Sequence, residues 1–333
     1  MRILLIAGAL GLLTACEATD NVATIAAFGQ TEPVKSSDDA ADDPAIWVHP
    51  SDPIKSLILG TDKQAGLYVY DLNGQVTQFL ETGEVNNVDL RQGFQIGDWI
   101  GDLAVASNRT NDTIALYQID SAGVVSDLGA IPSVETEPYG ICMGTLQNTP
   151  MIAVAHKTGN AIFYALSSPT TVAKTITVKF ETQLEGCVFD ETTDRVYIGE
   201  EEAGIWVVTY DDGEFTKPEM VDAVDGPSGI AGDVEGLAIY RTESDAYLVA
   251  SSQGNNSYAL YTLPDHRFAG RFRIGAGVVD GTEETDGLDV TSKALGPAFP
   301  EGILVVQDGI RPGGAFQNFK IVDWRAVKKA VLQ

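Results

Sequence analysis

The chain has 333 residues and 44% of them are hydrophobic, which allows a full core and excludes a disordered composition. Its 47 acidic and 21 basic residues give a net charge of −26. Such a surface repels nucleic acids and anionic membranes and attracts metal cations, so we expect no nucleic-acid partner. Solubility alone is the alternative explanation of the surface charge.

The first residues have the pattern of an export signal. Arg2 precedes an apolar run over 3–13, too short to span a bilayer, and "LTAC" then ends at Cys16. The pattern favours a lipoprotein signal peptide over 1–15, with a lipidated Cys16 anchored to a bacterial envelope membrane, in the periplasm or at the cell surface. Ordinary cleavage nearby, with secretion, is the alternative. Residues 16–30 would then form a tether.

Six copies of one unit follow, each an apolar strand, a polar turn and a second strand. They start at Leu57, Leu103, Ile152, Val196, Tyr247 and Ile303, at spacings of 44 to 56 residues. This is the length of four short strands with their turns, one propeller blade. We predict an all-β fold, a single-domain six-bladed β-propeller over 31–333. A strand in "TIAAFGQ" (24–30) would complete the last blade, and "DWRAVKKAVLQ" is the one fair helical pattern.

A second phrase, an acid with a short apolar run, falls once in each unit before that hairpin. Its acids are Asp43, Asp89, Glu137, Glu185, Glu235 and Asp286. The innermost strand of each blade lines the axis, so we expect these acids near one mouth of the channel. Two carboxylates 4 Å apart repel by roughly 4 kcal/mol at a dielectric near 20, so protons or cations must offset them. A non-functional acidic rim is the alternative.

Oxygen ligands are those that Ca²⁺ prefers, and the three histidines show no zinc-type spacing. Neighbouring units supply such oxygens from Glu185, Glu200, Glu201, Glu202, Asp233, Glu235 and Gln253. We therefore expect calcium at this mouth.

Three of the few basic residues occupy the polar turns of three consecutive units. These are Lys63, Arg109 and Lys157, and Tyr139 begins an expected inner strand beside them. His156 precedes Lys157 and is counted with the substrate-binding residues. Arginine binds phosphate oxygens bidentately and lysine provides a point charge, so cations on one flank and calcium on the other would suit a phosphate ester. For each basic residue singly, an ordinary exposed position is the alternative.

The remaining cysteines, Cys142 and Cys187, lie within apolar segments typical of strands. An exported protein could pair them, and two buried thiols fit the same segments at least as well. No histidine or second cysteine lies close enough in sequence to indicate a catalytic thiol.

Longer phrases carry a resemblance to a known family. "DDPAIWVHP", "NNVDLR", "ASNR", "TQLEGCVFD", "DVEGLAIY", "LVASSQGNNSYALY", "TDGLDV" and "QNFKIVDW" occur in this order. The chain resembles the β-propeller (alkaline, calcium-dependent) phytases over about residues 40–325. The resemblance implies hydrolysis of phytate (myo-inositol hexakisphosphate), as a 3-phytase-type phosphoric monoester hydrolase with several calcium ions.

The resemblance also implies roles for individual residues. Phosphate binding falls to Lys63, Arg109, Tyr139 and Lys157. Catalytic calcium ligands would be Glu185, Glu201, Asp233, Glu235 and Gln253, with Asp286 near the cleaved phosphate. Structural calcium would bind Asp43, the carbonyls of Pro44 and Val88, Asp280 and Asp308. Three positions depart from the family, which often has a lysine at Gln64 and acids at Thr158 and Ile310. The first two bear on the neighbouring phosphate site and the third on one structural calcium site.

We expect water activated by the metal to attack phosphorus directly, with no covalent intermediate, because no histidine, serine or cysteine phosphatase signature is present. Two alternatives come from other classes. One is a calcium-stabilised propeller lipoprotein that binds a polyanion without catalysis. The other is a calcium-dependent propeller esterase or lactonase, which would not need three basic residues in register. We expect a monomer.

Overall fold

The computed structural model describes residues 22–310, 312–314 and 316–332. The expected signal peptide and Cys16 lie outside the described residues. Within the described part of the chain, no helix has the length and apolarity that crossing a membrane would require.

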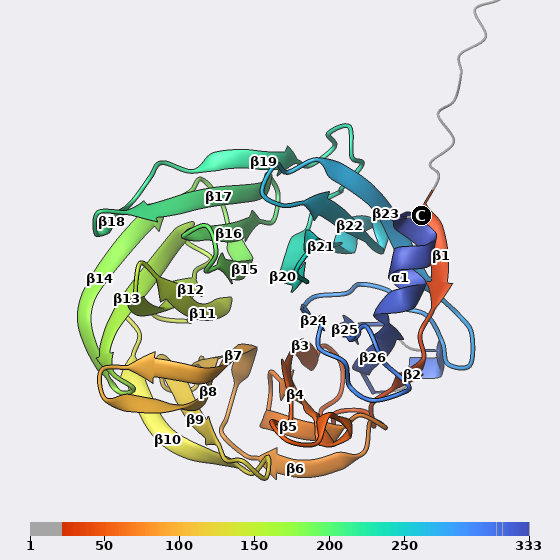
Figure 1. Ribbon diagram of the computed structural model, residues 1–333, viewed down its shortest axis with the longest axis horizontal. Coiled ribbons are helices and arrows are strands. Elements are labelled where there is room, and N and C mark those ends of the chain that lie inside the picture. Colours follow the sequence, from red (N-terminus) through yellow and green to blue (C-terminus); the bar gives the residue numbers. More distant parts are fainter. Residues whose placement is uncertain (1–21, 311, 315, 333) are drawn as a thin grey trace, which may run out of the picture.

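Six sheets surround a central axis, which confirms the predicted six-bladed β-propeller (Figure 1). In each blade the strands follow one another from the axis to the rim. Blades 1 to 3 contain β3 (Ala41–Trp47), β4 (Leu57–Asp62), β5 (Gly66–Asp71) and β6 (Val76–Leu80); β7 (Val85–Ile96), β8 (Trp99–Asn108), β9 (Thr113–Ile119) and β10 (Val125–Pro132); and β11 (Ile141–Leu146), β12 (Thr149–Ala155), β13 (Asn160–Ser168) and β14 (Thr171–Lys179).

Blades 4 to 6 repeat the plan with local changes. They contain β15 (Leu184–Asp190), β16 (Arg195–Glu200), β17 (Gly204–Asp211), β18 (Glu214–Phe215) and β19 (Glu219–Ala223); β20 (Val234–Arg241), β21 (Ala246–Ser252), β22 (Ser257–Thr262) and β23 (Phe268–Gly275); and β24 (Leu288–Thr291), β25 (Ile303–Asp308) and β26 (Asn318–Asp323). In blade 4, β18 and β19 both pair with β17. Three short 3-10 turns are η1 (Pro53–Lys55), η2 (Gln253–Asn255) and η3 (Pro312–Gly314).

The core lies between the blades. Each of six hydrophobic clusters joins side chains of two neighbouring blades. Alternate residues of a strand point to opposite faces, so both faces of the middle strands are buried, whereas the outer strands β6, β10 and β14 are largely exposed. On β4, Leu57 and Leu59 pack with blade 2, whereas Ile58 packs with blade 6. This explains why the middle strands read as continuous apolar runs.

The ring is closed by both ends of the described chain. The prediction that 24–30 completes the last blade is only partly right. β2 (Gly29–Gln30) pairs with β26 of blade 6, but β1 (Ala23–Ala26) pairs in parallel with β23 of blade 5. The expected C-terminal helix is present as α1 (Trp324–Val331), beside β1 and β26 (Figure 1).

A disulfide joins the inner strands of blades 3 and 4. Cys142 on β11 and Cys187 on β15 are bonded, with Cα atoms 5.7 Å apart. The alternative of two buried free thiols is therefore wrong.

We expect the double variant Cys142→Ala/Cys187→Ala to lose about 4 kcal/mol of unfolding free energy, because the bond closes a loop between residues 45 apart. Denaturant unfolding without reductant measures this loss. Reductant should lower the wild type toward the variant and leave the variant unchanged. Equal stability of the two proteins would show that the crosslink constrains the unfolded chain very little.

Candidate active site

The inner strands share one irregularity that builds the mouth of the channel. In four of them the pairing with the next strand shifts across two residues, and the first of these two is Asp42, Asn86, Glu185 or Glu235. Such bulges re-aim side chains at the rims of sheets. Tyr139 and Asp286 hold the same place just ahead of β11 and β24. One side chain per blade therefore forms a ring, which we call the mouth ring.

The mouth ring differs from the expected ring of acids in blades 1 to 3. Its members there are Asp42, Asn86 and Tyr139, whereas the sequence indicated Asp43, Asp89 and Glu137. Asp89 lies further along the channel and accepts a hydrogen bond from Met143 N (2.8 Å). Glu137 is exposed. Asp43 accepts a hydrogen bond from Val88 N (3.1 Å) in the next blade.

Asp42 and Asn86 are thus site residues that sequence reasoning missed. A signal for them exists, because a glycine follows the ring residue in the other four blades. A Cβ on Gly186 would lie 2.0 Å from the carbonyl oxygen of Glu235, and one on Gly140 would lie 1.8 Å from that of Glu185. This close approach requires glycine there. Asp43 and Asn87 hold the glycine positions in blades 1 and 2.

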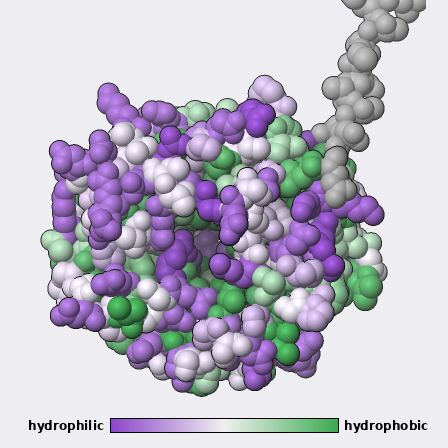
Figure 2. All heavy atoms as spheres, in the orientation of Figure 1, coloured by the Kyte–Doolittle hydropathy of each residue, from purple (hydrophilic) through white to green (hydrophobic). Residues whose placement is uncertain are grey.

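A cavity of about 320 Å³ opens inside the mouth ring. It is lined by Asp39, Lys63, Tyr139, Glu185, Glu201, Asp233, Glu235, Gln253, Glu284, Asp286, Gln307, Gly309 and Gln317. Figure 2 shows a central hollow edged by hydrophilic side chains on the face in view. Seven acids and one lysine in this lining make the cavity strongly negative unless cations enter it.

Of the three expected basic residues, Lys63 lines this cavity, whereas Arg109 and Lys157 are not among its lining residues. Lys63 Nζ is 2.9 Å from Asp39, 3.0 Å from Asp42 and 3.2 Å from Asp286. Burial lowers the pKa of Lys63, but the charges of Asp42 and Asp286 outweigh it and raise that pKa above its ordinary value. The ammonium is therefore charged, and three carboxylates fix its position.

The other two basic residues flank Lys63 and Tyr139. Arg109 donates to the Lys63 carbonyl oxygen (3.2 Å), and its buried Nε has no hydrogen-bond partner among the described residues. Lys157 Nζ lies 4.2 Å from the ring centroid of Tyr139, a cation–π contact. The Arg109 Nε–H is thus a buried donor that no described residue satisfies.

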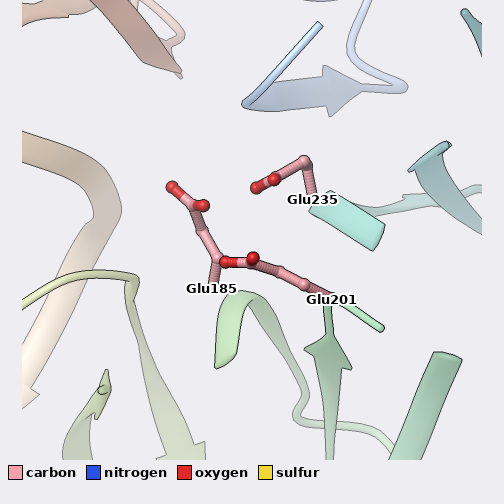
Figure 3. Close-up of side chains that lie close together, drawn as sticks. All are labelled: Glu185, Glu201 and Glu235. Carbon is pink, nitrogen blue, oxygen red and sulfur yellow. The ribbon is translucent and has the colours of Figure 1, made fainter. Parts of the chain in front are cut away.

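Three glutamates form the opposite flank. Oxygen atoms of Glu185, Glu201 and Glu235 lie within 4.8 Å of one another, and Figure 3 shows their carboxylates pointing into a common space. Burial raises the pKa of Glu185 to about 7. Burial and the charge of Glu185 raise the pKa of Glu235 well above its ordinary value, and burial raises that of Glu201. The raised pKa values indicate that the surrounding protein does not fully compensate the charges of these three carboxylates.

Two further expected ligands adjoin this cluster. Gln253 N donates to the Asp233 carbonyl oxygen (2.9 Å), and the Gln253 amide donates to Asp286 Oδ1. Burial, followed by the charge of Asp42, raises the pKa of Asp286 well above its ordinary value. Asp233, Gln253 and Asp286 therefore line the same cavity as the three glutamates.

The donor set fits a hard cation. It consists of carboxylate and amide oxygens, and no histidine or cysteine lines the cavity among the described residues. Glu235 Oε2 is buried without a hydrogen-bond partner among the described residues, so a cation ligand would satisfy it. Calcium takes six to eight such oxygens in flexible geometry.

A second cavity of about 290 Å³ continues the channel and shares no lining residue with the first. Asp43, Pro44 and Val88, the expected structural ligands, line it together with Asp89 and Arg91. Burial, and then the charge of Asp42, raises the pKa of Asp43 well above its ordinary value. Asp43, Pro44 and Val88 thus line a different cavity from the three glutamates.

The expected calcium- and substrate-binding residues that line neither cavity are Arg109, Lys157, Glu200, Glu202, His156, Asp280 and Asp308. His156 is buried, 3.9 Å from Glu135, and burial lowers its pKa. Asp280 and Asp308 contact Lys320. In blade 6 the polar-turn position of Lys63 and Glu201 is held by Gly309, which lines the cavity, rather than by Asp308.

Two of the departures from the resembled family are bound to neighbouring loops. The Gln64 amide donates to the carbonyl oxygens of Ser37 (2.8 Å) and Asp39 (3.0 Å). The Thr158 hydroxyl donates to Glu135 (2.8 Å). Neither residue lines the cavity.

Comparison with known proteins agrees with this geometry. A family model described as Phytase matches residues 1–333. A protein described as 3-phytase, from Bacillus subtilis (strain 168), is 38% identical over 360 residues, covering 98% of this chain and 92% of the relative. The chain therefore belongs to the phytase family.

Proposed function

We propose that this protein hydrolyses phosphate monoesters of phytate, as a calcium-dependent phosphoric monoester hydrolase of the 3-phytase type. The observation that carries the proposal is the meeting of three basic residues and three glutamates at one mouth of the channel. Family membership and the related 3-phytase support the same activity.

The metal would be held by the oxygen-rich flank. Glu185, Glu201, Asp233, Glu235 and Gln253 are the residues proposed to bind catalytic calcium. When bound, the metal neutralises charge on phosphate and lowers the pKa of water. Structural calcium is proposed at Asp43 with the carbonyls of Pro44 and Val88.

The basic flank would bind and orient the substrate. Arg109 can offer its free donors to the equatorial phosphate oxygens, and Lys157 and Lys63 add positive charge. Tyr139 lines the cavity, and its ring contacts the Lys157 ammonium. Because no histidine, serine or cysteine lines the cavity among the described residues, attack by water without a phosphoenzyme is the proposed chemistry. Export, a lipid anchor at Cys16 and a monomeric state complete the proposal.

Phosphate release from phytate by the purified mature chain tests this function. We expect release with calcium, loss with chelator and recovery when calcium is returned. Acid-quenched samples should contain no phosphoprotein. A folded chain that releases no phosphate at any calcium concentration would instead support a propeller that binds a polyanion without chemistry.

A further inference from the structure

A fully buried lysine lies where strands and loops of the ring closure meet. The side chain of Lys320 on β26 is 0% exposed. Its Nζ contacts Asp280 Oδ1 at 2.6 Å, Asp308 Oδ2 at 2.7 Å, Gln30 Oε1 at 2.8 Å and Asn318 Oδ1 at 3.1 Å. These oxygens come from the loop before β24, from β25, from the closing strand β2 and from β26.

The arrangement is at odds with calcium at Asp280 and Asp308, which the family resemblance implies. Calcium would need oxygens of the same two carboxylates at 2.3–2.6 Å. The ammonium of Lys320 already occupies the space between them, and a second buried cation beside it would be repelled strongly in a medium of low dielectric. Ile310, where the family often has an acid, adds no carboxylate to offset that charge.

We infer that the Lys320 ammonium replaces calcium at this site and closes the propeller without a metal. It links Gln30 on the closing strand directly to Asp280 and Asp308. The same Asp308 accepts a hydrogen bond from Glu283 N (3.2 Å), in the loop that leads to Asp286. The internal cation thus also anchors the segment that brings Asp286 to the cavity.

A site held by the Lys320 ammonium and a site held by calcium predict different effects of Asp280→Asn on stability in chelator. If an ammonium holds the site, Asp280→Asn removes half of a buried ion pair whether or not calcium is present. If calcium holds it, chelator has already emptied the site, and the variant loses nothing further there.

The test measures the thermal midpoint of the mature protein with Asp280→Asn, in chelator and in calcium. We expect a fall of about 5 °C that is the same in both conditions. Isothermal titration should show the same number of bound calcium ions in wild type and variant. A fall confined to calcium, or the loss of one bound ion, would overturn the inference.

Two further variants sharpen the comparison. Lys320→Met should lower the midpoint in chelator, and if it fails to fold, Asp280→Asn still decides the question. Asp43→Asn is the matched control, since no lysine or arginine contacts that carboxylate among the described contacts, and it should weaken only the stabilisation by calcium. All these readouts are unfolding and calcium binding, so they are independent of phytate turnover.

Discussion

Replacement of Arg109 by alanine should lower kcat/KM for phytate by a factor of about 100 to 1,000. The structure places this guanidinium beside Lys63, with an Nε that no described residue satisfies. In the proposed function its donors align on phosphate oxygens as charge develops. Losing one such preorganised donor typically costs 10²–10³ in rate. Initial rates of phosphate release in calcium measure the effect.

A conservative variant and a control variant help to interpret the result for Arg109→Ala. Arg109→Lys keeps the charge but loses the planar fork, so it should retain more activity than alanine while remaining well below wild type. Arg195→Ala is the matched control, because Arg195 begins β16, at the end away from Glu200, and donates to the Pro264 carbonyl oxygen. Near-normal turnover by Arg109→Ala would remove this residue from phosphate binding and would favour an enzyme acting on a neutral ester.

The repeat made the architecture predictable, since six units of similar length admit few arrangements other than a propeller. The sequence also predicted equivalent positions for Lys63, Arg109 and Lys157, because each lies in the polar turn between the two strands of its repeat. The bulge defeated the alignment of acids. It adds a residue to one strand of a pair, and in blade 1 both bulge residues are acids, so the sequence could not tell Asp42 from Asp43. In blades 4 and 5 a glycine follows the acid, and Glu185 and Glu235 were predicted correctly.

Other features depend on contacts that no local pattern encodes. The split between β1 and β2 arises because the two segments meet different blades, although only two residues separate them. The disulfide follows from the meeting of β11 and β15 across a blade boundary. The cation at Asp280 and Asp308 comes from Lys320, which the sequence presents only as part of "QNFKIVDW".

The change Glu235→Gln should abolish most phosphate release. In the metal-free protein it should also raise the free energy of unfolding at pH 8, where the charge of the buried glutamate destabilises the fold. Glu235 is buried beside Glu185, and its pKa is well above the ordinary carboxyl value. A carboxyl with a raised folded pKa costs stability as the pH rises from its unfolded value toward the folded one. In chelator, therefore, the glutamine variant should match wild type near pH 5 and be more stable at pH 8, by at most about 1.4 kcal/mol per pH unit.

Calcium should turn this advantage into a loss, because bound metal offsets the very charges that destabilise the metal-free protein. The measurement is the increase in thermal midpoint on adding calcium at pH 8, for Glu235→Gln and for Glu219→Gln, an exposed control on β19. A smaller increase for Glu235→Gln alone would identify Glu235 as a ligand. An equal increase in both would mean that calcium binds elsewhere, and the raised pKa would then belong to a group that works protonated, as a hydrogen-bond donor to the substrate.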